Sequence, residues 1–196
     1  MAKPHRVQER VEENPAKAFR TLAPQLSKAA RKRHPARAEE ILGALSRHGD
    51  ALPVAWRALL VELADEQPLA ESAAVGLAQV RPHRSMVPPM IRRVAARLDA
   101  CAAGEVGRSW DDEIGLAVLA RCADRRAAPV LVRLLAAPRV AHWDLLLAAC
   151  LRCAAPELIP ALTRWLAAAK KRGVSPEWDG FAEGKQVLRA LKRGAA

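Results

Sequence analysis

Residues 112–137 and 143–168 are two copies of one helical unit, and this pair decides the fold. The first copy reads DEIGLAVLARCADRRAAPVLVRLLAA and the second reads WDLLLAACLRCAAPELIPALTRWLAA. They align at an offset of 31 residues without a gap, and eleven positions are identical. The identical pairs are Leu116/Leu147, Ala117/Ala148, Arg121/Arg152, Cys122/Cys153, Ala123/Ala154, Pro129/Pro160, Leu131/Leu162, Arg133/Arg164, Leu135/Leu166, Ala136/Ala167 and Ala137/Ala168. Each copy has an apolar helical stretch, a tight turn and a second helical stretch, which predicts a repeat array.

Two earlier segments carry the same unit in weaker form. Residues 41–60 fit it after a deletion of two residues, and residues 70–99 form a further copy. Each copy has a proline near the start of its second helix and an arginine four residues later. These pairs are Pro53–Arg57, Pro89–Arg93, Pro129–Arg133 and Pro160–Arg164. Because proline is favoured in the first turn of a helix, the four pairs set the register of the second helices.

The unit resembles the HEAT-like repeat, in particular the short bacterial type of about 30 residues. The resemblance rests on the string A-x-L-x-R-x-x-D-x-x-A-x-P-x-L-x-x-L-L within residues 115–135 and on its copies, and it covers roughly residues 36–171. It implies a right-handed stack of helix pairs, with the first helices on the convex side and the second helices on the concave side. Arrays of this type bind partners along the concave face.

From this resemblance we predict an all-α fold, a right-handed α-solenoid of about four HEAT-like helix pairs with a capping helix at each end. We assign residues 1–14 to a flexible tail and residues 15–196 to a single domain. That domain comprises a cap at 15–35, repeats at 36–171 and a second cap at 172–196. The apolar spacing is helical throughout, and no alternating stretch predicts a strand. The expected helices cover residues 15–33, 36–47, 53–66, 68–80, 88–103, 111–123, 126–137, 140–154, 156–171 and 181–193.

Composition narrows the class of protein. The chain of 196 residues is 51% hydrophobic, which is typical of a globular protein and excludes a disordered one. No apolar run reaches the roughly 18 residues of a membrane span, and the charged N-terminus lacks a secretory signal. The four cysteines lie within apolar helical segments. We therefore expect a cytoplasmic protein with no membrane span.

The charge indicates the type of partner. The chain has 32 Lys and Arg against 21 Asp and Glu, a formal net charge of +11, and the basic residues are spread along most of the sequence. This balance predicts an acidic partner, which is a nucleic acid, an acidic protein surface or an anionic lipid. The alternative is that an Arg-rich and Ala-rich chain uses its positive surface only for solubility.

The arginines of the Pro-x-x-x-Arg pairs are the main candidate binding residues. At 100° per residue, core-facing positions lie two, five and six residues after the proline, and the arginine lies about 150° from that face. The predicted core positions are Ala55, Ala58, Leu59, Ile91, Val94, Ala95, Leu131, Leu134, Leu135, Leu162, Trp165 and Leu166. The arginines are therefore expected to point off the core and to form a ladder on the concave face. The predicted partner-binding residues are Arg57, Arg93, Arg97, Arg133, Arg164 and Lys171.

A guanidinium ladder suits phosphates or carboxylates, because each guanidinium presents a planar fork to two oxygens. A structural use is the main alternative. In HEAT-like proteins an aspartate of the turn often bonds to the arginine of a second helix, so Asp50 and Asp124 are candidate partners for Arg57, Arg93 and Arg133. Solvation of the arginines is the remaining alternative.

Two cysteines form a C-x-x-C motif, Cys150 and Cys153, which is compatible with redox activity or with half of a zinc site. However, Cys153 is the repeat equivalent of Cys122, and Cys150 is the equivalent of Leu119. Both are buried positions of a first helix, and no second ligand pair has suitable spacing. We therefore interpret both cysteines as small core residues and predict no metal and no cofactor.

The segment from Ser109 to Glu113 combines a tryptophan with acidic residues. As structure, it places a cap and negative charge in the first turn of a helix. As function, it is faintly similar to the Trp and Asp of HEAT-like alkylpurine DNA glycosylases, which extrude a damaged base. The catalytic candidates under that reading are Trp110, Asp111 and Asp112, although the wider pattern of the glycosylases is not visible.

Two further features have a structural and a functional interpretation. The basic stretch Lys28-Ala-Ala-Arg31-Lys32-Arg33-His34 is either a phosphate-binding arm or the solvated end of a cap helix. Trp143 and Trp165 are expected to be structural, whereas Trp56 is expected to be partly exposed.

The sequence favours a non-catalytic HEAT-like interaction module, or adaptor, that binds an acidic protein segment in a basic concave groove. The first alternative is a nucleic-acid-binding protein, with glycosylase-like chemistry as its extreme form. A further alternative is an immunity or regulatory protein that binds a toxin or an enzyme. These functions differ in salt dependence, because each phosphate contact on duplex DNA contributes a log–log slope of about −0.9.

Overall fold

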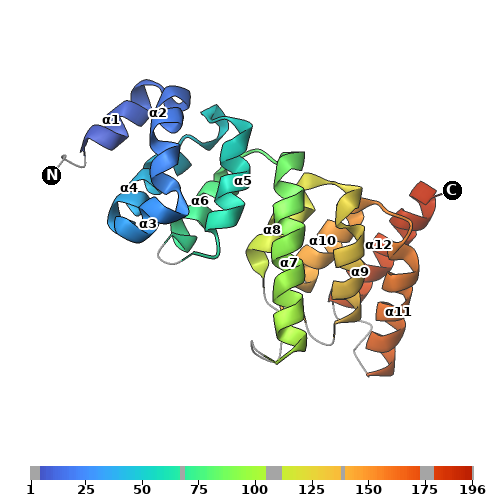
Figure 1. Ribbon diagram of the computed structural model, residues 1–196. Coiled ribbons are helices and arrows are strands. Elements are labelled where there is room, and N and C mark those ends of the chain that lie inside the picture. Colours follow the sequence, from blue (N-terminus) through green and yellow to red (C-terminus); the bar gives the residue numbers. More distant parts are fainter. Residues whose placement is uncertain (1–4, 67–68, 105–111, 138–139, 173–178, 196) are drawn as a thin grey trace. The chain divides into compact units, whose positions relative to one another are not determined.

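The computed structural model describes residues 5–66, 69–104, 112–137, 140–172 and 179–195 (Figure 1). Within these ranges every regular element is a helix, which confirms the all-α prediction. The chain divides into two compact units, Met1–Pro89 and Met90–Ala196, where the sequence predicted one domain. In the described ranges, no helix combines the length and apolar character that a membrane crossing requires.

The first unit is built from α-helices and short 3-10 helices, denoted η. Helix α4 packs on α1 and α6, and α6 in turn packs on α5. The elements in chain order are α1 (His5–Glu13), α2 (Pro15–Leu22), η1 (Ala23–Leu26), α3 (Lys28–Arg33), α4 (Pro35–Ser46), η2 (Gly49–Ala51), α5 (Val54–Leu63), α6 (Ala70–Gln79) and η3 (Arg84–Met86).

A helix, α1, occupies the segment that the sequence assigned to a tail. Its only apolar residues are Val7 and Val11, which lie four apart on one face and are both buried. This face packs against α2 and α4. Two valines among seven polar residues form too weak a stripe to be distinguished from a solvated tail in the sequence. Asn14 then caps α2, because its side-chain oxygen accepts a hydrogen bond from the Lys17 amide at 3.0 Å.

The predicted helix over residues 15–33 is divided into three elements. The α-helix ends at Leu22, a 3-10 turn that contains Pro24 follows, and Ser27 has extended dihedral angles before α3 begins. Proline has no amide hydrogen and disfavours the helical conformation of the residue before it. A single continuous helix is therefore the wrong prediction for this segment.

The core of the first unit centres on Trp56, which is completely buried and meets Phe19 edge-on at 5.9 Å between ring centroids. The prediction that Trp56 is partly exposed is wrong, and Ala55, a predicted core residue, is exposed. Burial of a large indole gains far more than burial of an alanine methyl group. Helix α5 therefore presents Trp56 and Leu60 to the core instead of the face that the repeat register indicated.

The second unit begins within a long helix that starts in the first unit. The elements are α7 (Val87–Ala102), α8 (Glu113–Cys122), η4 (Arg125–Ala127), α9 (Ala128–Ala136), α10 (Trp143–Cys153), α11 (Leu158–Lys171) and α12 (Asp179–Ala195). Helix α10 packs between α8 and α12, and α9 packs against α11 (Figure 1). The predicted core residues Leu131, Leu134 and Leu135 of α9 are all buried, as are Leu162 and Leu166 of α11.

The two aligned copies share an unusual backbone conformation. The repeat-equivalent residues Ala123 and Ala154 end α8 and α10, and both have φ of 50° in the left-handed region. This conformation costs a non-glycine residue roughly 1–2 kcal/mol. Its occurrence at the same place in both copies shows that the sequence repeat is also a repeat of backbone geometry.

Candidate functional site

The four repeat-equivalent arginines have different environments. Arg57 and Arg93 are each only 8% exposed, whereas Arg133 and Arg164 are exposed. The prediction that all four point away from the core is therefore wrong for the first two. In both cases the structure instead supports the alternative of structural hydrogen bonding.

Arg57 holds the chain that follows α6. Its Nε donates to the Arg81 carbonyl at 3.1 Å, and its Nη2 donates to Oδ1 of Asp50 at 3.3 Å. The same Asp50 oxygen accepts the Arg81 amide at 2.6 Å. Arg57 and Asp50 therefore clamp both backbone polar groups of one residue, which is 31 positions beyond Asp50. The predicted use of the turn residue Asp50 as an arginine partner is confirmed.

Arg93 is bound in a fork by Asp112 rather than by a turn aspartate. Its Nε lies 3.2 and 3.0 Å from the two carboxylate oxygens, and its Nη2 lies 2.9 Å from Oδ1. The two side chains are only 5% and 1% exposed. Asp112 also caps α8 by accepting the Gly115 amide at 3.0 Å. A side chain at Gly115 would have no space, because its Cβ would overlap with Oδ2 of Asp112.

This arrangement bears on the catalytic candidates. Asp112 is buried, both of its oxygens accept hydrogen bonds, and it caps the N-terminus of α8. A carboxylate held in this way is not open to a substrate. The other two candidates, Trp110 and Asp111, lie outside the described residues.

Arg133 forms an ion pair with Asp99 of α7. The two side chains are 46% and 66% exposed, so the pair contributes little stability. The other turn aspartate, Asp124, pairs with Arg126 at 2.6 Å within its own turn. The remaining predicted binding residues, Arg97 and Lys171, are exposed on α7 and at the end of α11.

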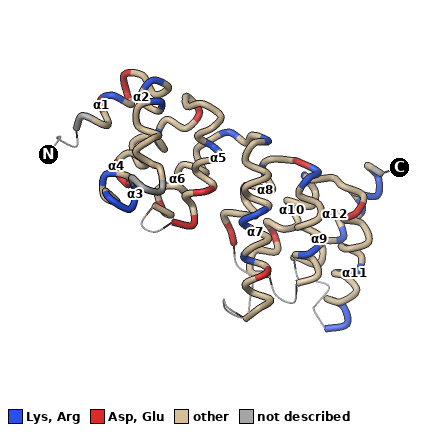
Figure 2. The backbone as a smooth tube through the Cα atoms, viewed as in Figure 1, with Lys and Arg blue, Asp and Glu red and all other residues tan. Residues whose placement is uncertain are grey.

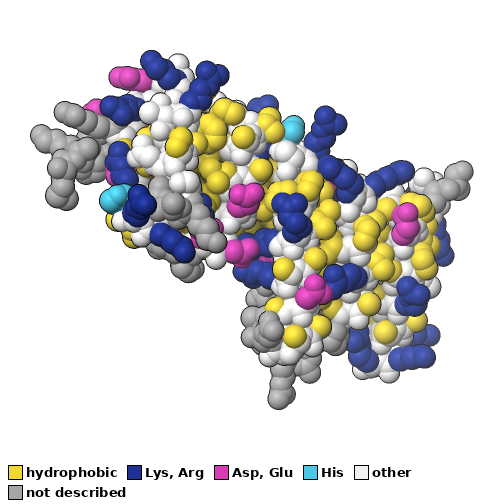
Figure 3. All heavy atoms as spheres, viewed as in Figure 1, with side chains coloured by type: hydrophobic (Ala, Val, Ile, Leu, Met, Phe, Trp, Pro, Cys, Tyr) yellow, Lys and Arg dark blue, Asp and Glu magenta, His cyan; other side chains and the backbone are white. Residues whose placement is uncertain are grey.

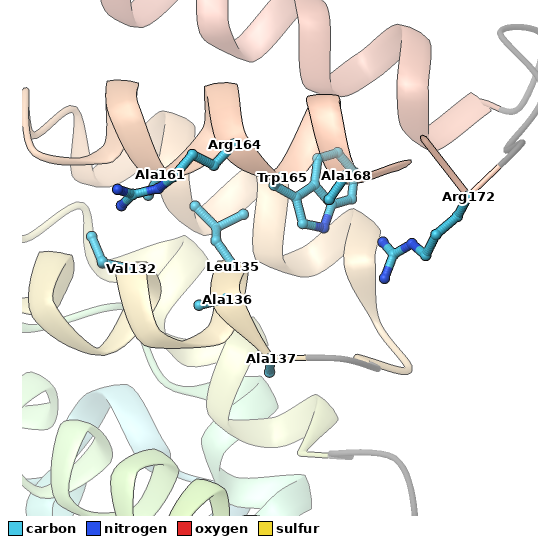
Figure 4. Close-up of a pocket in the computed structure, with 9 residues that line it drawn as sticks. All are labelled: Val132, Leu135, Ala136, Ala137, Ala161, Arg164, Trp165, Ala168 and Arg172. Atoms are coloured by element: carbon cyan, nitrogen blue, oxygen red, sulfur yellow. The ribbon is translucent and has the colours of Figure 1, made fainter. Parts of the chain in front are cut away.

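Arg164 lies at a pocket between α9 and α11, which we call the α9–α11 pocket (Figure 4). Its volume is about 230 Å³. The lining residues are Val132, Leu135, Ala136, Ala137, Ala161, Arg164, Trp165, Ala168 and Arg172. Seven of these nine residues are apolar, and the other two are arginines. Figure 3 shows basic side chains around exposed apolar surface on the second unit.

The two arginines of the pocket lie at opposite ends of it, with Trp165 between them (Figure 4). Eight residues separate Arg164 from Arg172, which corresponds to about 12 Å along a helix axis. Both are exposed, and neither forms an ion pair with any described residue. The pocket is therefore an apolar surface with a guanidinium available at each end.

The tryptophan of the pocket is supported by α12. A Cβ at Gly184 would lie 2.8 Å from the Trp165 ring, so the absence of a side chain there lets the two helices approach closely. Trp165 is partly exposed rather than buried, because one side of it forms a wall of the pocket. The sequence placed Trp165 in the core and did not name Arg172 as a binding residue. Continuing the register of α11 two turns beyond Arg164 leads to Lys171, which the sequence analysis named, whereas Arg172 lies one residue further and about 80° from Arg164 around the helix.

The chemistry of this pocket is that of binding. Its lining has no carboxylate, histidine or thiol, so none of these residues is a nucleophile or a general acid near neutral pH. Each guanidinium can accept a carboxylate or a phosphate in its fork, and the apolar part of the lining suits an aliphatic or aromatic side chain.

Cys150 and Cys153 do not line this pocket and are buried, which confirms their interpretation as core residues. Burial raises the pKa of the Cys150 thiol to about 12, and burial is also the main cause of the raised pKa of Cys153. Both are free thiols, and both are protonated near neutral pH. In the described ranges, no group of three or more His, Cys, Asp or Glu side chains gathers at a possible metal site.

The basic stretch in the first unit is partly tied to the fold. Arg31 of α3 donates to the Leu26 carbonyl and pairs with Glu66 at 2.7 Å. Lys32 and Arg33 are exposed. Arg31 of this basic stretch therefore has a structural role.

No protein-family model, curated protein or solved structure matches the chain.

Proposed function

We propose that this protein is a non-catalytic interaction module whose α9–α11 pocket binds an acidic protein segment. One observation carries the proposal: an apolar pocket has Arg164 at one end and Arg172 at the other. This site retains one member of the predicted arginine ladder. Arg57 and Arg93 are not part of this site, because their guanidiniums form hydrogen bonds within the fold.

The proposal includes the architecture of a HEAT-like array and a cytoplasmic location. The packing of α10 between α8 and α12, and of α9 on α11, supports a regular stack in the second unit. The shared left-handed conformation of Ala123 and Ala154 supports the same view. The buried free thiols Cys150 and Cys153 suit a reducing compartment.

The spacing of the two arginines indicates the form of the bound segment. An extended chain rises about 3.3 Å per residue, so four residues span the roughly 12 Å of helix axis between the backbone positions of the two arginines. In an extended chain, residues i, i+2 and i+4 point to the same side. A segment of the form acid-x-apolar-x-acid therefore matches both guanidiniums and places its central side chain in the pocket.

The expected affinity of a short segment is low. Burial of one apolar side chain contributes about 1.5–3 kcal/mol, and each exposed ion pair contributes about 0.2–1 kcal/mol. These contributions sum to about 1.9–5 kcal/mol, which corresponds to a Kd between about 0.2 and 40 mM for a peptide that contains only this motif. A natural partner would add contacts beyond the pocket.

The test is an NMR titration with a short acetylated peptide that has two glutamates four residues apart and a leucine midway between them. We expect the indole N–H signal of Trp165, assigned with Trp165→Phe, to shift while that of Trp143 stays in place. Substitution of the peptide leucine by serine, or of both glutamates by glutamine, should weaken binding.

The matched protein variants are Arg164→Gln/Arg172→Gln and the control Arg20→Gln/Arg152→Gln, which removes two exposed arginines elsewhere. The first should raise the Kd roughly three- to tenfold, and the control should leave it within a factor of two. Equal binding by both variants would contradict the proposal. Tight binding of duplex DNA by this same pocket would instead favour the nucleic-acid alternative.

A further inference from the structure

The C-terminal helix α12 has a second basic surface that the pocket does not use. Its inner face packs on α10 and α11 through buried residues, which include Phe181, Val187 and Leu191. Its outer face has four basic residues, all of them exposed. These residues are Lys185, Arg189, Lys192 and Arg193, and we call them the α12 cationic face. Figure 2 shows basic positions along this helix to its end near the C-terminus.

The four cations form a row because of their helical spacing. At 100° per residue they fall within an arc of about 100°, on the side of α12 opposite its buried residues. Glu183 of the same helix lies outside this arc. None of the four forms an ion pair with a described residue, and Lys185 lies 4.3 Å above the ring of Phe181. The row is therefore not neutralised by the part of the protein that the structure describes.

We propose that the α12 cationic face binds the phosphate backbone of a nucleic acid, independently of the segment bound in the α9–α11 pocket. Contacts to the phosphate backbone require neither a pocket nor recognition of bases. They require exposed cations spaced along the row of phosphates. From Lys185 to Arg193 the row is about 12 Å long, because eight residues each rise 1.5 Å. Duplex DNA presents roughly seven phosphate charges over that length.

The buried apolar face of α12 and the cationic character of its outer face disfavour the two other anionic partners, an anionic lipid surface and an acidic protein. A helix that inserts into a lipid interface needs a free apolar face, but the apolar face of α12 is buried and the helix has no exposed large hydrophobic residue. A specific protein interface is held mainly by buried apolar or aromatic anchors in pockets. The outer face of α12 has exposed cations but no exposed large hydrophobic residue to serve as such an anchor.

The test measures binding of a labelled mixed-sequence duplex of about 20 base pairs by fluorescence anisotropy, at about 50 and 200 mM salt. Four phosphate contacts predict a log–log slope near −3.6, so this increase in salt should weaken binding about 150-fold. The variant Arg189→Gln/Lys192→Gln/Arg193→Gln should have a slope near −0.9 and lose only about 3.5-fold. Its binding at 50 mM salt should be more than about tenfold weaker than that of the unaltered protein.

A charge-matched control separates this surface from net charge alone. The variant Arg20→Gln/Arg47→Gln/Arg152→Gln removes three exposed cations, one each from α2, α10 and the turn after α4, and it should keep a slope near −3.6. Thermal unfolding followed by circular dichroism checks that both variants fold. Equal loss of binding in the two variants would overturn the proposal, as would the absence of duplex binding at 50 mM salt.

Two further measurements distinguish the partners. Vesicles of phosphatidylcholine with about 30% phosphatidylserine should not bind, and binding that depended on the α12 cationic face would assign it to membranes and overturn the proposal. The α12 variant should bind the acidic peptide with unchanged affinity, whereas Arg164→Gln/Arg172→Gln should still bind DNA. Failure of either surface is therefore distinguishable from failure of the other.

Discussion

Arg93 and Arg164 occupy the same place in their repeats, yet one is buried and the other lies at the edge of a pocket. The difference comes from their neighbours. Arg93 faces Asp112, a buried helix cap that can take both nitrogens of its fork, and no described carboxylate pairs with Arg164. A repeated residue therefore has a repeated backbone position but not a repeated role. Arg57 and Arg93, which are themselves buried and bonded to an aspartate, are structural, whereas Arg164, which has no such partner among the described residues, stays available to a partner.

The largest expected effect is at the buried pair. Asp112→Ala leaves the Arg93 guanidinium buried without its carboxylate and also removes the cap of α8, so it should destabilise the fold by about 3–5 kcal/mol. Chemical denaturation measures this loss. The double variant Arg93→Met/Asp112→Leu removes both charges and should recover part of it. A loss below about 1 kcal/mol for Asp112→Ala would show that the pairing of Arg93 with Asp112 is not structural, and would contradict the distinction between Arg93 and Arg164.

The second effect is at the clamp in the first unit. Arg57→Met keeps the apolar stem but loses the bonds to the Arg81 carbonyl and to Asp50. We expect a loss of about 1.5–3 kcal/mol in the free energy of unfolding, because these are hydrogen bonds from a charged group with little exposure. Combination with Asp50→Ala should be clearly less than additive. Additivity of the two losses would show that the clamp is not a unit.

A third test uses positions where the two repeats do share a conformation. Ala123→Gly and Ala154→Gly should each stabilise the protein by up to about 1 kcal/mol, because glycine adopts positive φ without a steric penalty. Ala148→Gly, within α10, is the control and should destabilise by a similar amount. Thermal unfolding distinguishes the signs. Opposite responses at the two turns would show that they are not equivalent.

The smallest effect is expected at the exposed arginines. Arg133→Gln and Arg164→Gln should each change the free energy of unfolding by no more than about 0.5 kcal/mol, because exposed ion pairs and solvated cations contribute little. The effect of Arg164→Gln should appear in peptide binding instead. A large loss of stability in either variant would show that the substituted arginine has a structural role, as Arg57 and Arg93 do.

Much of the helical architecture was predictable from local pattern. The repeat, its turns and the buried faces of α9 and α11 follow from apolar residues three and four apart and from prolines near helix starts. The burial of Cys150 and Cys153 followed from their repeat equivalents. In the candidate site, Arg164 was predicted, but Arg172 and the pocket were not. A pocket depends on how two helices pack, which the pattern of one helix does not specify.

The amino-acid sequence alone determined the all-helical class and the repeated unit, because helical periodicity, prolines and turn residues act over a few neighbouring positions. The tertiary structure decided which arginines are buried. Asp112 lies 19 residues beyond Arg93, and Arg81 lies 24 beyond Arg57, so both contacts form only when separate helices pack. It also decided the face that α5 buries, because burial of Trp56 outweighs the preference of the repeat register. Whether an arginine is structural or available for binding thus depends on side-chain and backbone partners that lie far from it in the chain.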